Sequence, residues 1–394
     1  MLEIAMPPAP SLAVFAQYAA AAHAAAAAAG LSPLRWRWNG EELDSGGGGQ
    51  LTFGGPTPDR SPFFAKPRLL PSFLRYLNRH PALSFAFAPE CVGGASQGPR
   101  PDEGSRERFD ELGLALDLLG SDAMPAHLAS ALGPLLVDGS GNSHRAEVNV
   151  EKLWNPALPD RGHLGLVELR ALRMEPNPER ATAVAAVFRA LLARLAVAPF
   201  DSPLFDWGAA LHDRFGLPSV LLRDLVHVLD DLAENQLAPG ERLREMALAA
   251  PAPIADVVLG SGQLVLTPAI EFWPLVGDVA SQERLTARVV DSSTRRIEIR
   301  IRVPPGESPG LVHAEGRAVA LHPLAREPDA HVHVGAVRFR SFVPSPGFHP
   351  GLSAVDPLVV EWSRGRLGRR IELHSWIPGG GVYEALPADG AEAA

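Results

Sequence analysis

Residues 142–172 read NSHRAEVNVEKLWNPALPDRGHLGLVELRAL, two short alternating runs joined by a loop rich in Pro, Gly and Asp. Successive side chains of a strand point to opposite faces of its sheet. On one face, the first run places Arg145, Glu147, Asn149 and Glu151, and the second places Leu166, Glu168 and Arg170. Apolar residues occupy the other face of both runs. We expect an antiparallel hairpin with one apolar and one charged face.

The charged face has two interpretations. One face of an antiparallel sheet is often simply solvated. Charges of both signs on so few positions also suit a site for an anion together with its metal. The residues alone leave both interpretations open.

Composition limits the class of protein. The 394 residues, 46% hydrophobic and 21% charged, suit a soluble globular chain with room for two domains. A net charge of -9 without a long basic run argues against a general nucleic-acid binder. The single cysteine, Cys91, excludes an internal disulfide framework and a cysteine-based zinc site. A reducing cytoplasm fits this usage.

The N-terminal region predicts no targeting or membrane segment. It lacks a basic stretch and carries Glu3 early, unlike a signal peptide. The alanine-rich run 19–29 is too short and too weakly apolar to span a bilayer. It should instead form a helix that starts after an N-cap at Ser11 and ends near Ala29. Residues 2–6 alternate, which predicts a short strand carrying Glu3.

The rest of the chain divides into a mostly helical part and a later β part. Helical spacing is found near 66–80, 105–119, 124–136, 178–197, 207–215 and 218–232. Strand patterns follow at 297–303, 332–339, 357–362 and 370–376, separated by Gly/Pro turns. We therefore predict an α+β domain over 1–250, an all-β sandwich or jelly-roll-like domain over 255–385, and a tail over 386–394. The glycine run 46–49 is either a flexible linker or a place where backbone closely approaches a ligand.

Several stretches together resemble a known family. They are SFLRYLNRHPALSFAFA with ASQGPRPDE, NSHRAEVNVEKLW, GLVELRA, WGAALHDRFGLP, VVDSS, FRSFVPSPGFHP and HSWIPGGGVYEALP. In this order they resemble the bacterial "putative amidoligase" family, over nearly the whole chain. That family is commonly found as the C-terminal half of long proteins that begin with a transglutaminase-like domain.

The resemblance implies a fold and a chemistry. The family's kinship is with glutamine synthetase-like carboxylate–amine ligases, in which an antiparallel sheet, its polar face covered by helices, holds ATP and a divalent metal. Such ligases activate a carboxylate as an acyl phosphate, which an amine or peptide amine then attacks. Carboxylates hold Mg²⁺ against the phosphates, and arginine neutralises the transferring phosphoryl group. ATP and Mg²⁺ are therefore the expected cofactors.

The resemblance also assigns roles to residues of this sequence. It implies metal ligation by Glu3, Glu147 and Glu168. It implies catalytic roles for Arg100, Arg145 and Arg170. It implies cofactor contacts from Gly48, Gln97, Asn142, His144 and Asn149.

The sequence departs from the family pattern at two places. The family's strand has Asn and His where this chain has Ala5 and Pro7, and its glycine run closes with Asn-His where this chain has Gly49 and Gln50. The family domain also normally continues upstream of Glu3, with a further metal carboxylate, so a truncated and incomplete sheet is expected.

Three hypotheses follow. The chain is an ATP-dependent ligase, a catalytically degenerate relative that acts as a binding or scaffold subunit, or one half of a split enzyme completed by a partner chain. Loss of ligands from a site of several carboxylates should cripple metal-dependent phosphoryl transfer. Retention of the charged hairpin favours the ligase and the split enzyme. Neither nucleic acid nor membrane is an expected partner.

Overall fold

The two alternating runs pair as predicted in the computed structural model. The structure describes residues 3–36, 40, 42–44, 47–93, 96, 98–158, 162–273, 275–278, 288–343 and 349–375. Strand β5 (Val148–Asn149) runs antiparallel to β6 (Val167–Leu169), with Val148 opposite Leu169 and Asn149 opposite Glu168. Residues directly opposite one another share a face. The two polar rows therefore lie on one face of the sheet, and the two apolar rows on the other.

A third strand, β3 (Leu51–Phe53), completes this small sheet and was not predicted from the sequence. It pairs with the other edge of β6 and places Thr52 opposite Glu168. On the apolar face, Val148 and Leu169 are buried in the main hydrophobic cluster. The same cluster holds side chains of the long helices, among them Phe73 and Phe188, whose rings meet edge to face.

The glycine run extends this sheet instead of forming a linker. Gly48, at φ 99°, is bridged to Arg173 in antiparallel fashion, and Gly49 N–H donates to the carbonyl of Leu172 at 3.2 Å. A Cβ on Gly49 would lie 1.8 Å from the carbonyl oxygen of Arg173. Glycine is therefore required where the run meets the chain's own backbone. The linker interpretation is wrong for residues 47–49.

The helices begin and end close to the predicted positions. Ser11 caps the first of them by accepting from Val14 N–H. The ranges are α1 (Leu12–Ala28), α2 (Pro62–Ala65), α3 (Leu69–Arg79), α4 (Ala82–Phe85), α5 (Arg106–Leu118), α6 (Pro125–Leu132), α7 (Pro178–Val197), α8 (Ala210–Phe215), α9 (Pro218–Glu234) and α10 (Glu241–Ala247). None of the helices in the described ranges is long and apolar enough to cross a membrane.

The strand predicted over residues 2–6 is wrong. Residues 3–6 have no regular structure and are exposed. Alternation of apolar residues is not enough to make a strand where no neighbouring strand pairs with it, because the pairing supplies most of its stability. Glu3 therefore does not lie on a strand of the polar sheet.

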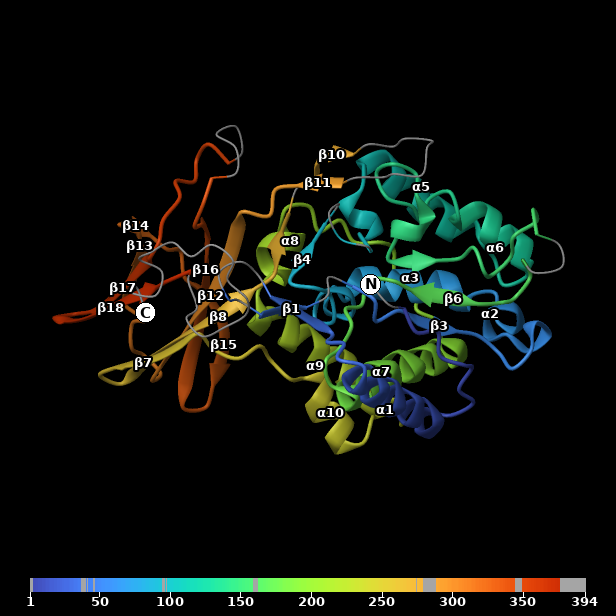
Figure 1. Ribbon diagram of the computed structural model, residues 1–394, viewed down its shortest axis with the longest axis horizontal. Helices are drawn as coiled ribbons and strands as arrows, with labels where there is room; N and C mark the ends of the chain where they lie inside the picture. The colour runs from blue at the N-terminus through green and yellow to red at the C-terminus, as the bar shows by residue number, and fades with distance from the viewer. Residues whose placement is uncertain are drawn as a thin grey trace.

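The β part is a pair of antiparallel sheets (Figure 1). One has the order β15-β16-β12-β8-β7 and the other β14-β13-β17-β18. The first contains β15 (His322–Glu327), β16 (Ala330–Arg340), β12 (Thr294–Val303), β8 (Gly262–Ala269) and β7 (Ala255–Leu259), and the second β14 (Arg317–Ala318), β13 (Leu311–Ala314), β17 (Leu358–Arg364) and β18 (Leu367–Leu373). Ile299 from one sheet and Trp362 from the other lie in one buried cluster. The α+β class is confirmed, and the boundary at 250–255 stays a prediction.

Short elements complete the described chain. They are β1 (Leu34–Trp36), β2 (Glu42–Asp44), β4 (Cys91–Val92), β9 (Glu271–Phe272), β10 (Leu275–Asp278), β11 (Arg288–Val290) and the 3-10 turns η1 (Pro58–Arg60), η2 (Pro101–Glu103) and η3 (Ser143–Arg145). Strands β4 and β9 pair in parallel and so join the helical part to the β part. Arg296 of β12 adds to this connection by donating to the carbonyls of His212 (2.5 Å) and Asp213 (2.7 Å) near the end of α8.

The close contact at Gly49 predicts a steric cost for any side chain there. We expect Gly49→Ala to lower the free energy of unfolding by about 1–3 kcal/mol, because the backbone of Arg173 must move aside. Urea denaturation measures the change. Gly139→Ala is the matched control, since nothing lies within 4 Å of a Cβ at that position. Equal effects of the two substitutions would contradict the pairing of the glycine run.

Candidate functional site

The buried guanidinium of Arg100 is the point where distant segments meet. It uses all five of its N–H donors inside the protein. Two go to Asp102 (2.9 and 2.8 Å), two to the carbonyls of Leu77 and Asn78 (3.1 and 3.3 Å), and one to the hydroxyl of Ser84 (2.7 Å). Burial alone lowers the pKa of Arg100, but the carboxylates of Asp102 and Glu147 more than offset this and leave it raised. Arg100 therefore stays charged, and no donor remains for a phosphate.

Ser84 connects Arg100 to the polar face of the sheet. Its hydroxyl accepts from Arg100 and donates to the carboxylate of Glu147, which uses its one donor and one of its two lone pairs. Glu147 is 4% exposed. Burial raises the pKa of Glu147 to about 7, although Arg100 and Ser84 act in the opposite direction. A carboxyl group with this pKa can both take up and release a proton near neutral pH.

Further hydrogen bonds hold the turn that contains Arg100. Glu103 accepts from the backbone N–H of Arg100 (2.8 Å) and pairs with Nε2 of His212 at 2.6 Å. The amide of Asn78 donates to Asp102 at 3.0 Å. Three of the quoted stretches, 72–88, 95–103 and 207–218, thus converge on one turn, and Ser84 links them to a fourth, 142–154.

The other buried carboxylate of the hairpin, Glu168, is held by two cations. Lys152 Nζ lies 2.6 Å from Oε2, and Arg170 pairs with Oε1. The amide of Gln50 bridges the pair when its nitrogen is turned toward Glu168: in that orientation it donates to Glu168 at 2.9 Å and accepts from Nη2 of Arg170 at 3.1 Å. Nε of Arg170 is buried without a hydrogen-bond partner in the described parts of the chain.

The remaining predicted residues mostly support the turn that precedes β5. Asn142 caps η3 by accepting from the backbone N–H of His144 at 2.9 Å. Asn149, buried in the sheet, donates to the carbonyl of Ser143 and accepts from the backbone N–H of Glu151. His144 is exposed and pairs with Glu151 at 3.3 Å, and half-buried Arg145 ends η3. Gln97 lies outside the described residues.

The three carboxylates expected to bind Mg²⁺ do not fit such a site. Glu147 is engaged by Ser84 beside Arg100, and both oxygens of Glu168 contact cations. Glu3 is exposed on an irregular segment. Within the ranges that the structure covers, no group of three or more His, Cys, Asp or Glu residues could hold a metal ion. A magnesium site of Glu3, Glu147 and Glu168 would need a different arrangement of these side chains.

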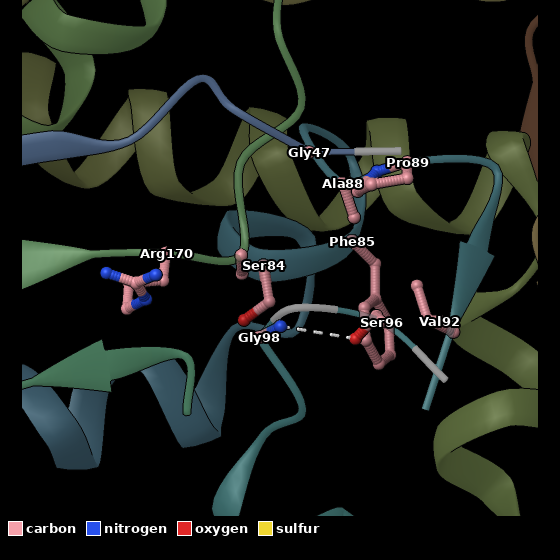
Figure 2. A pocket seen from close by; sticks show the side chains of 10 residues that line it. Gly47, Ser84, Phe85, Ala88, Pro89, Val92, Ser96, Gly98 and Arg170 are labelled. Atoms are coloured by element: carbon pink, nitrogen blue, oxygen red, sulfur yellow. Dashed lines mark hydrogen bonds between the residues drawn. The ribbon is translucent and has the colours of Figure 1, made fainter. Parts of the chain in front are cut away.

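A small pocket, with a cavity volume of about 10 Å³, lies where the Arg100 cluster meets the sheet. Figure 2 shows Ser84 in the middle of its lining, Arg170 at one end and the apolar side chains of Phe85, Ala88 and Val92 at the other. Gly98 contributes backbone, and a Cβ there would lie 2.6 Å from Cα of Ala171. The pocket therefore combines a charged end with an apolar end.

Comparison with known proteins identifies the family. A family model described as "Putative amidoligase enzyme" matches residues 1–394. The chain belongs to this family. No curated protein matches it. The stretches that carry the amidoligase resemblance contain five residues of the buried polar cluster: Ser84, Arg100, Glu147, Glu168 and Arg170.

Three members of the cluster were missed by the sequence analysis. Ser84 and Lys152 lie inside the stretches that carry the amidoligase resemblance, and Gln50 was noted only as a departure. No local signal indicates Lys152, because strand alternation would place it on the apolar face, whereas it lies in the turn after β5 and reaches Glu168 with its long side chain. Nothing local in the sequence indicates that His212 pairs with Glu103, which lies 109 residues earlier.

The pKa of Glu147 predicts a pH-dependent stability. Because its folded-state pKa is raised above the unfolded value, its favourable contribution is complete below about pH 4.5 and is lost as pH rises through about 7. We compare the free energy of unfolding of Glu147→Gln with that of the wild type. As pH rises from 4.5 to 8, this difference should change in favour of the variant by an amount on the order of 3 kcal/mol. Urea unfolding across this range measures the difference. Glu107→Gln, at an exposed position of α5, should show no such pH dependence. If the stability difference between Glu147→Gln and the wild type did not change with pH, the raised pKa of Glu147 would be refuted.

Proposed function

We propose that this amidoligase-family chain is an ATP-dependent carboxylate–amine ligase whose reaction takes place beside the polar face of the β5–β6 hairpin. The observation that carries the proposal is the position of Arg170. Among the residues that the structure describes, its buried Nε has no hydrogen-bond partner, and the residue lines the pocket together with Ser84. An unpaired buried N–H donor is costly, and an anionic ligand group would satisfy it.

Each polar residue at the pocket would have a separate role in the reaction. Arg170 stabilises the charge that develops as an oxygen of the substrate carboxylate attacks the γ-phosphorus and the bond to the ADP oxygen breaks. The amine nitrogen then attacks the acyl carbon, and the carbon–oxygen bond to phosphate breaks. Ser84 passes the proton released by the amine to Glu147, whose pKa of about 7 suits this role. Arg100 keeps Ser84 in position.

The contacts of Glu147 and Glu168 exclude them as free metal ligands in this arrangement, so no step is assigned to a divalent ion. They also support a second candidate, a binding or scaffold subunit without catalysis. In that case the cluster recognises an anionic partner group and no bond is formed. The two candidates differ in a single measurable outcome, turnover. A completing partner chain, the split-enzyme hypothesis, is a variant of the first candidate and predicts turnover only after the partner is added.

Trapping of the activated acid tests the proposal. Hydroxylamine intercepts an acyl phosphate as a hydroxamate, so the chain should form hydroxamate and ADP from ATP and a panel of amino-acid and dicarboxylic acids. Arg170→Met should reduce the rate about 100-fold, as expected for the loss of a group that stabilises the transition state. Arg189→Met, at an exposed position of α7, is the matched control. ATP binding with no hydroxamate, with or without co-purifying proteins, would favour the binding subunit and reject the ligase.

A further inference from the structure

The charge around Glu168 is not balanced. Its one carboxylate, 3% exposed, contacts the ammonium of Lys152 and the guanidinium of Arg170. Gln50, the third neighbour, is neutral. Two permanent cations against one anion leave about one positive charge on this part of the sheet, where a magnesium site would need an excess of negative charge.

Donors as well as charge remain unused in this cluster. Lys152 carries three N–H donors, directs one to Glu168, and its side chain is 52% exposed. Nε of Arg170 is buried and has no partner in the described ranges. Thr52, opposite Glu168 on β3, adds an exposed hydroxyl on the same face. An anion with several oxygens would satisfy these donors together, whereas a metal ion would be repelled by both cations.

We infer that Lys152 is a built-in cation in the place where the family resemblance implies a metal, and that this site binds a phosphate-bearing anion without a divalent ion. The inference deepens the proposed function, on which it rests for the nature of the ligand. An ammonium is a compact point charge suited to phosphate oxygens, and Glu168 holds it at the edge of the sheet. Glu168 therefore positions a cation and does not ligate a metal.

The sequence makes this inference easy to test. Only two of the 36 Lys and Arg residues are lysines, Lys66 and Lys152. Lys66 is exposed at the end of α2, away from the β5–β6 hairpin in sequence, and makes no ion pair among the described residues. Lys66→Met is consequently a matched control for Lys152→Met.

Calorimetry with tripolyphosphate and with ATP, each in excess EDTA and in excess Mg²⁺, is the decisive experiment. We expect at least one of the two to bind in EDTA, no more weakly than in Mg²⁺, since Mg²⁺ neutralises the phosphate charge that Lys152 recognises. Lys152→Met should weaken binding by about 10- to 100-fold, as for loss of a charge-assisted hydrogen bond. Lys66→Met should leave it unchanged. Tighter binding of ATP would identify a nucleotide ligand, and tighter binding of tripolyphosphate a free phosphate anion.

Binding that requires Mg²⁺, binding of neither anion, or equal affinities of Lys152→Met and wild type would overturn the inference. A second readout covers a misfolded variant. In the wild-type chain, acetylation of Lys152 followed by mass spectrometry should slow when tripolyphosphate is present, while acetylation of Lys66 continues. Equal labelling of both lysines would also overturn it. Metal-free binding without hydroxamate formation would leave the inference standing and reject only the ligase.

Discussion

The structure of the candidate site depends on the burial of one guanidinium. A charge that is removed from water is stable only when its hydrogen-bonding groups are all satisfied. Arg100 meets this condition by drawing in the end of α3, the serine of α4 and the η2 turn. These segments are separated in sequence, and the hydrogen bonds of Arg100 join them. The pKa of Glu147 follows from the same arrangement, since Arg100 and Ser84 limit how far burial can raise it.

Much of the fold could be predicted from local patterns. The ends of α7, and the common face of Asn149 and Glu168, follow from periodicity and strand alternation, which depend on neighbouring residues alone. The failures had a common physical origin. Strand β3 and the paired glycines owe their conformation to residues more than a hundred positions away, and residues 3–6 lack a neighbour that would make them a strand.

The site was predictable in composition but not in connectivity. Sequence alternation places Glu147, Glu168 and Arg170 on one polar face, and the structure brings them there. The sequence could not show that Ser84 would donate to Glu147 and that Lys152 would pair with Glu168, because both contacts join different elements of the fold. Those contacts occupy the two carboxylates that were expected to bind a metal: Glu147 accepts from Ser84, and Glu168 pairs with Lys152 and Arg170. Local pattern therefore predicted which charged residues share one face, and tertiary contacts determine which partner each of them has.

The contact of Arg296 with the end of α8 has a consequence for how the protein is made. His212 and Asp213 are synthesised well before β12. Their carbonyls therefore cannot accept from the guanidinium of Arg296 until that strand has been made. Glu103 and the Arg100 turn rest against that same helix end. The contact between Arg296 and the end of α8 can therefore form only after β12 has been synthesised, and a shorter nascent chain lacks it.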